Sequence, residues 1–148
     1  EFVPFSNAIK SGVDTVMMGH LLVDEIDPKL PCSLSKAAHE ILVKELNFKG
    51  LILTDDMQMD AIKKGFSVPK AAELSVLAGA NCLIYRDLEY AKEALAALKE
   101  TSISQSTLKD SIKKVTEFKK EKLSVGVTSD ITFEPGEKFL SEIKNRLV

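Results

Sequence analysis

Three short apolar segments, each followed by a longer segment with helical spacing, limit the folds open to this chain more than any other feature. Residues 13–18, 51–54 and 82–85 read as strands whose starts lie roughly 30 to 40 residues apart, enough for a strand and a crossover helix. The second segment is apolar at consecutive positions, which suits a parallel strand covered on both faces. The alternation predicts an α/β fold with parallel strands adjacent in sequence order.

Residues that start and stop helices bound the segments between these strands. Residues 34–46 carry apolar side chains on one helical face, with Ser35 as a plausible N-cap and Asn47 as a plausible stop. Pro69 falls in the first turn of the next helix, which Gly79 can end. We predict three further helices, near residues 88–99, 108–118 and 139–147.

The charge balance and the cysteines narrow the function classes. The chain has 148 residues, with 20 basic against 22 acidic side chains and a net charge of -2, so nothing in its charge favours nucleic acid or an anionic membrane as a partner. No apolar run approaches the ~20 residues of a membrane span. Cys32 and Cys82 are isolated from each other and from any histidine at metal spacing. We therefore expect no metal site, no disulfide and no cofactor.

Polar groups follow all three predicted strands, and ligands bind at the carboxyl ends of strands in folds of this class. His20 follows the first strand, Asp55 and Asp56 the second, and Arg86 and Asp87 the third. Because parallel strands place their carboxyl ends at one edge, these groups are expected to share a site. We interpret this edge as a functional pocket, which is a more specific interpretation than a structural role for each group.

Plainer interpretations exist for each group. Asp55 or Asp56 could cap the segment that starts at Met57, and a single histidine such as His20 is more often structural than catalytic. The Arg86–Asp87 pair reads as a solvated turn or a local ion pair. His39 lies off the apolar stripe of its helix and is expected to be exposed. The residues alone leave these alternatives open.

The order of the motifs resembles the later part of the catalytic barrel of family 3 glycoside hydrolases, most of all the β-N-acetylglucosaminidase branch. The long middle match is LPCSLSKAAHEILVKELNFKGLILTDDMQMDAI, which resembles the family's Pro-Ala-Ser-Leu-Ser, helix, Leu-Gly-Phe, strand, Ser/Thr-Asp-Asp pattern. It is flanked by FVPFSNAIKSGVDTVMMGH, AAELSVLAGANCLIY and STLKDSIKKVTEFKKEKL, which resemble the neighbouring segments in the family's order. Cys32, Asn47 and Asn81 depart mildly from the usual Ala, Gly and Asp.

The resemblance implies a retaining mechanism, in which a carboxylate forms a glycosyl-enzyme intermediate that water hydrolyses. By this match Asp55 is the catalytic nucleophile. Asp56 is its neighbour, which orients or caps and belongs with the substrate-binding residues. His20 would line the sugar pocket. The partner implied is a carbohydrate, an N-acetylglucosaminide that the family's usual chemistry would draw from peptidoglycan.

The resemblance also covers only part of the family's barrel. The loop with the His-Asp acid/base pair has no counterpart in this sequence, and a complete (β/α)₈ barrel needs at least about 200 residues. We therefore expect residues 1–123 to be roughly the last three βα units of a barrel and residues 124–148 to be a tail with a short helix. Such a chain is expected to be nearly inactive alone, and to form a homo-oligomer or join a missing N-terminal half. The compartment stays open, with cytoplasm favoured over secretion.

Two other functions remain as alternatives. A non-catalytic remnant of the same fold would only bind sugar or a partner. A receiver-type signalling domain would accept a phosphoryl group on Asp56, because Met59 follows that residue at the spacing seen in such domains. Against the receiver, the first strand ends in His20 rather than in an acidic pair.

Overall fold

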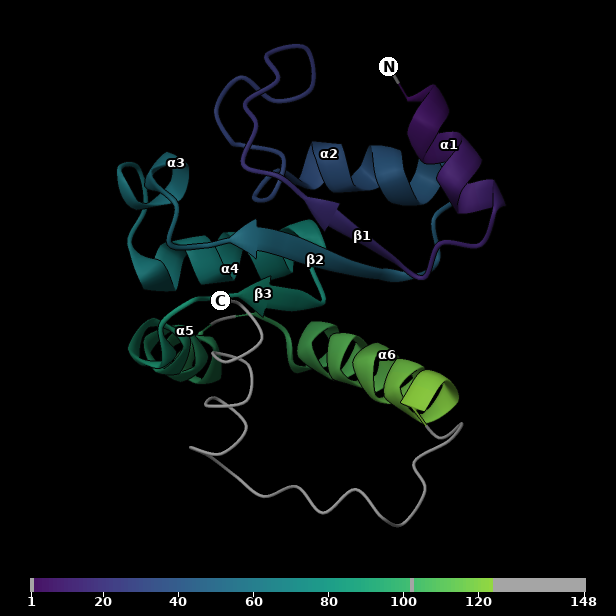
Figure 1. Ribbon diagram of the computed structural model, residues 1–148. Helices are drawn as coiled ribbons and strands as arrows, with labels where there is room; N and C mark the ends of the chain where they lie inside the picture. The colour runs from purple at the N-terminus through teal and green to yellow at the C-terminus, as the bar shows by residue number, and fades with distance from the viewer. Residues whose placement is uncertain (1, 102, 124–148) are drawn as a thin grey trace, which may run out of the picture. The chain divides into compact units, whose positions relative to one another are not determined.

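A computed structural model describes residues 2–101 and 103–123 of the chain (Figure 1). Glu1–Glu117 form one compact unit, and a second unit begins at Phe118, of which only the end of the last helix is described. The elements follow in the order α1 (Val3–Lys10), β1 (Thr15–Met18), α2 (Lys36–Glu40), π-helix η1 (Ile41–Glu45), β2 (Leu51–Asp56), α3 (Asp60–Lys63), α4 (Val68–Ala78), β3 (Cys82–Ile84), α5 (Leu88–Glu100) and α6 (Gln105–Leu123).

The three strands form one parallel sheet in the order β1-β2-β3, as the sequence predicts. Thr15 pairs with Leu51 and Met18 with Thr54 along the β1–β2 ladder. Strand β2 is longer than predicted and includes both adjacent carboxylates, Asp55 and Asp56. The α/β class with parallel strands is thereby confirmed.

Two clusters of buried side chains hold the helices against the sheet. Leu42 and Phe48 pack with Ile52 of β2, next to half-buried side chains of α1 and β1. Leu34, Met57, Ile62 and Ala71 form the other cluster, against which side chains from β3 pack. Figure 1 shows α4 running behind the sheet. Burial of the larger apolar side chains, each worth about 1.5–3 kcal/mol, is the main force that orders the strands.

Gly50 permits the close approach by which the chain enters β2. A Cβ at this position would lie 2.2 Å from the backbone oxygen of Asp14, which accepts a hydrogen bond from the Leu51 N–H. No side chain fits in that space. Glycine is therefore required for the first bond between the β1 and β2 segments.

The helix boundaries agree with their capping residues, but one helix changes type. Ser35 caps α2 through its hydroxyl, and Gly79 ends α4 with a φ of 122°. The helix predicted over residues 34–46 is helical over residues 36–45, but α2 passes into the π-helix η1 at Ile41. Leu46 is the C-cap of η1, and Asn47 follows it with a φ of 57°. The helix predicted near residues 139–147 lies outside the described residues.

His39 is buried, contrary to the expectation of an exposed side chain. It is 1% exposed, and Gly79 lies over its ring, where a Cβ would come within 3.5 Å of Nδ1. The residue lies off the stripe that faces the sheet, but α4 covers that side of α2. His39 is buried because two helices pack together. The spacing of apolar residues within one helix does not show which of its other faces a second helix will cover.

One face of the sheet is less covered than the other. The register aligns Met17, Leu53 and Cys82 in a row across the three strands. Met17 is 56% exposed and the other two are half-buried, whereas Ile52 on the opposite face is 2% exposed. Within the described part of the chain, no helix is long and apolar enough to cross a membrane.

Candidate functional site

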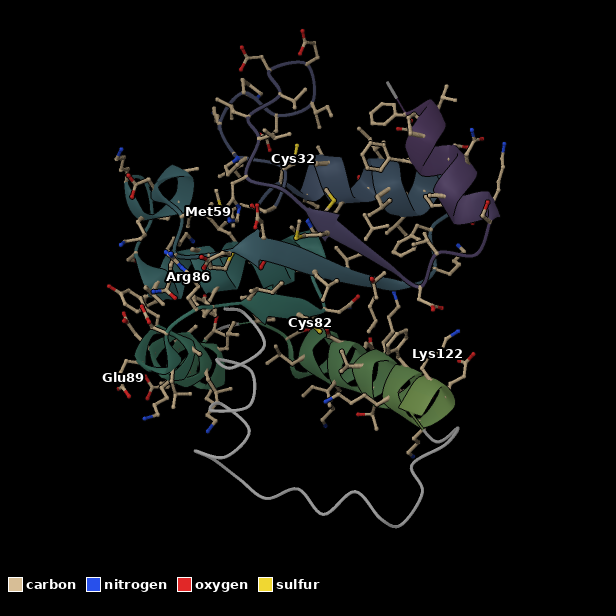
Figure 2. All side chains as sticks on the ribbon, in the orientation of Figure 1. Cys32, Met59, Cys82, Arg86, Glu89 and Lys122 are labelled. Atoms are coloured by element: carbon tan, nitrogen blue, oxygen red, sulfur yellow. The ribbon has the colours of Figure 1, made fainter. Side chains whose placement is uncertain are left out.

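The polar groups that follow the three strands do meet at one edge of the sheet. His20 from the loop after β1 and Arg86 from the loop after β3 both contact Asp56, the last residue of β2. Figure 2 shows Arg86 at the end to which the β2 arrow points, with Met59 at the same end. The site is therefore built around the terminus of the central strand, as expected from the topology.

A β-bulge lies at this terminus. Two residues, Thr54 and Asp55, separate the β3-paired positions of β2, whereas a single residue separates their partners Cys82 and Ile84. At the bulge, the Thr54 hydroxyl accepts the Ile84 N–H across 3.1 Å and so ties the side chain of β2 to the backbone of β3. Bulges bend a strand and redirect its side chains, so the direction of Asp55 is set here and not by simple alternation.

The two adjacent carboxylates differ in how far they are engaged. Asp56 accepts the Gln58 N–H at one oxygen and pairs with the Arg86 Nε at the other, 2.5 Å away. Asp55 accepts only the N–H of its neighbour, at 2.7 Å through Oδ1. Its Oδ2 has no hydrogen-bond or ion-pair partner among residues 2–101 and 103–123. Asp55 is half-buried and keeps one oxygen available for chemistry.

Neither carboxylate caps a helix. The N-cap position of α3 is Met59, which makes no side-chain cap bond. Asp56 does fold the turn after β2, because its carboxylate accepts a backbone N–H two residues on. A purely structural role therefore accounts in part for Asp56, which stabilises the turn. For Asp55 it accounts only for the hydrogen bond to the N–H of its neighbour.

His20 uses both ring nitrogens inside the fold. Its Nε2 lies 2.9 Å from the backbone oxygen of Asp56, and its Nδ1 lies 2.7 Å from the hydroxyl of Ser33. A carbonyl only accepts, so Nε2 carries the hydrogen, and in the neutral ring Nδ1 accepts from the Ser33 hydroxyl. A sugar contact through a ring nitrogen would require one of these two bonds to break.

Gln58 joins the loops after β2 and β3. This side chain is 4% exposed; its amide donates to the Asp87 carboxylate at 2.6 Å and accepts the Asp87 N–H at 2.8 Å. Of the two plainer interpretations of Arg86 and Asp87, the local ion pair is wrong, since Arg86 pairs with Asp56 and Asp87 with Gln58. The solvated turn agrees with the exposure of both residues. Sequence reasoning missed Gln58 and Ser33, because isolated polar residues in turns carry no spacing signal.

The side chains of His39 and Tyr85 take no part in these polar contacts, since their buried polar atoms have no hydrogen-bond partner in the described structure. Burial lowers the pKa of His39 to about 4, against a smaller opposing effect of the Ser33 backbone, and neither ring nitrogen has a hydrogen-bond partner in the described structure. Burial also raises the pKa of Tyr85 to about 12. Among the described residues, no three His, Cys, Asp or Glu side chains gather in a way that could hold a metal ion.

Comparisons with known proteins connect this geometry to a family. Residues 1–118 match the family described as glycosyl hydrolase family 3 N terminal domain. A beta-hexosaminidase of Nitrosomonas eutropha is 35% identical over 99 residues, and one of Stenotrophomonas maltophilia K279a is 31% identical over 108. These alignments cover 66% and 73% of this chain, but the chain spans only 28% and 32% of those relatives.

Solved structures agree with the sequence matches. A family 3 beta-N-acetylglucosaminidase from Paenibacillus sp. FPU-7 superimposes with a TM-score of 0.78 at 30% identity, covering 97% of this chain and 29% of that one. A beta-N-acetylglucosaminidase from Thermotoga maritima gives 0.68 at 29% identity, covering 78% and 28%. These similarities favour the glycosidase interpretation over the receiver-type alternative.

Proposed function

Because this chain belongs to glycosyl hydrolase family 3, we propose that it forms part of a retaining β-N-acetylhexosaminidase in which Asp55 is the nucleophile. The observation that carries the proposal is the difference between the two carboxylates at the end of β2. Both oxygens of Asp56 are engaged, whereas Oδ2 of Asp55 has no partner among the described residues. A nucleophile needs such an oxygen, held rigidly and directed at the substrate.

In the proposed reaction, Oδ2 of Asp55 attacks the anomeric carbon while the glycosidic bond breaks and the leaving oxygen takes a proton. Water then hydrolyses the glycosyl ester, so the configuration at the anomeric carbon is retained. The Asp56 N–H, bonded to Oδ1, keeps the carboxylate in one orientation. Arg86 balances the charge of Asp56, so that two adjacent carboxylates do not both face the sugar unpaired.

The proton for the leaving group has no evident source among residues 2–101 and 103–123. His20 is bonded through both ring nitrogens, and His39 is buried away from the strand ends. We therefore assign the acid/base to a segment that these 148 residues do not include, and expect the chain alone to be nearly inactive. A non-catalytic remnant of the fold would be inactive as well, and covalent labelling distinguishes it from part of an active enzyme.

The architecture fits a larger closed sheet. We assign β1, β2 and β3 to consecutive strands near the end of a (β/α)₈ barrel, with the Met17–Leu53–Cys82 row on its inner face. Support comes from the parallel order, from the exposure of that row, and from the fraction of each relative that the chain spans. The substrate class is a terminal β-linked N-acetylglucosaminide, with peptidoglycan fragments as the natural source.

Covalent labelling tests the assignment directly. The protein that carries this chain is incubated with a 5-fluoro-N-acetylglucosaminyl fluoride, and the labelled peptide is mapped by mass spectrometry. We expect one added sugar, on Asp55. A label on Asp56 or on any other carboxylate would overturn the assignment, and an unlabelled protein that still binds N-acetylglucosamine would favour the remnant.

A further inference from the structure

We infer that Thr54 and His20 are positioning residues that hold the β-bulge at the end of β2, and that this bulge sets the direction in which Asp55 presents its free oxygen. The inference rests on the proposed function, since it assigns these residues through the nucleophile. In this proposal, neither Thr54 nor His20 contacts the reacting atoms. Thr54 acts by accepting a backbone N–H of β3, and His20 by donating to a backbone carbonyl of β2.

Thr54 holds the bulge on the β3 side. The Ile84 N–H of β3 lies at the bulge, where Asp56 is the paired residue of β2. Here the Thr54 hydroxyl accepts it across 3.1 Å, and the ladder resumes where Met57 donates to the Ile84 oxygen at 2.9 Å. Thr54 is 0% exposed, so water does not substitute readily for its oxygen. Without the hydroxyl, the Ile84 N–H would lose an acceptor that is itself fully buried.

His20 holds the bulge on the β1 side. The four β1–β2 pairs, from Thr15–Leu51 to Met18–Thr54, are all offset by 36 residues, and His20 and Asp56 are offset by 36 as well. The imidazole N–H therefore meets the strand at the level where the ladder would have continued. It donates to the Asp56 carbonyl at 2.9 Å, and Ser33 orients the ring from its other side.

Asp55 lies between these two attachments. Thr54 before it is bonded towards β3, and Asp56 after it is bonded towards β1, so the backbone that carries the nucleophile is held from both sides. The chain could otherwise relax towards a regular strand, which would rotate the Asp55 side chain away from its present direction. A displacement of about 1 Å at a reacting group can cost about 100-fold in rate.

Three variants in the protein that carries this chain test the inference. Thr54→Val is close to isosteric and removes the acceptor, whereas Thr54→Ser keeps it. Thr15→Val is the matched control, because Thr15 lies in the same sheet and its side chain has no hydrogen bond to another described residue. Each variant is measured by amide hydrogen exchange at Ile84, by kcat and KM, and by the rate of Asp55 labelling.

For Thr54→Val we expect about tenfold faster exchange at Ile84, and about 100-fold slower labelling and kcat with KM nearly unchanged. Thr54→Ser should stay within about fivefold of the wild type, and Thr15→Val should match it. A purely structural role would lower stability in Thr54→Val without lowering kcat of the folded protein. Should Thr54→Val fail to fold, His20→Leu against His20→Gln tests the same bulge from the β1 side.

The outcomes separate the two proposals. If the wild type is labelled at Asp55 and folded Thr54→Val is labelled equally fast, the positioning role is overturned while the proposed function stands. If the wild type is labelled on another residue or not at all, the proposed function fails and the inference fails with it. Faster exchange at Ile84 together with slow labelling at Asp55 supports both.

Discussion

The Nε2 of His20 donates to the backbone carbonyl of Asp56 across 2.9 Å and so joins the loop after β1 to the end of β2. The bond needs the hydrogen on Nε2, and the Ser33 hydroxyl on Nδ1 selects that tautomer. The end of the central strand is thus held by a side chain where the backbone ladder stops.

This bond predicts a difference between two His20 variants. His20→Gln can place an amide N–H near the position of Nε2, whereas His20→Leu leaves the Asp56 carbonyl without its donor. We expect His20→Leu to lower the free energy of unfolding by about 1–3 kcal/mol and His20→Gln by less. Urea unfolding of both variants checks this, and equal losses would show that packing rather than the hydrogen bond is what His20 provides.

The two carboxylates at the end of β2 should respond differently to amide substitution. In the protein that carries this chain, Asp55→Asn should leave the fold intact and reduce kcat by several orders of magnitude, because an amide cannot form the glycosyl ester. Asp56→Asn should be milder, since it weakens the contact with Arg86 and keeps an oxygen for the Gln58 N–H. Steady-state kinetics on both proteins decide, and a larger loss for Asp56→Asn would reverse the assignment.

The free energy of unfolding should decrease as the pH falls, because buried His39 resists protonation. Burial lowers its folded pKa from 6.5 to about 4, so the unfolded chain takes up a proton at a higher pH than the folded one. The contribution of the neutral His39 to the free energy of unfolding is fully present above about pH 6.5. It is lost as the pH falls towards 4, at about 1.4 kcal/mol for each pH unit.

Urea unfolding of the 148-residue chain between pH 4 and 7 measures this dependence. His39→Leu should flatten the slope in that window, because the substituted side chain does not titrate. His20→Gln is the matched control, because it replaces the other histidine of the chain and leaves His39 in place. A slope that survives in His39→Leu would assign the effect to carboxylates.

The isolated chain should associate. Within the described residues, β1 and β3 each pair on one side only, and Met17 and Ile84 are 56% and 40% exposed on the sheet. Unpaired strand edges next to apolar surface favour association with a second copy. Sedimentation equilibrium of the 148-residue chain should give a dimer or larger species. Met17→Lys should shift it towards monomer, and a stable wild-type monomer would contradict the prediction.

The elements of this fold follow from signals that lie within a few residues of each other. The consecutive apolar residues before Asp55 predicted a covered strand, and Ser35 and Gly79 predicted helix ends, because capping bonds form between near neighbours in sequence. The parallel order followed from the alternation of strands and helices. These features need no knowledge of how distant segments align.

The tertiary structure decided which polar groups at the strand ends are free. The bulge at Thr54, the pairing of Asp56 with Arg86, and the bond from His20 all depend on the register between strands that lie 30 or more residues apart in sequence. A shift of one residue in that register would reverse the side-chain directions, and no local pattern records it. The burial of His39 under α4 has the same origin. The sequence by itself thus determined which residues reach the edge of the sheet. The packing of distant segments left one oxygen of Asp55 there without a partner in the described part of the chain.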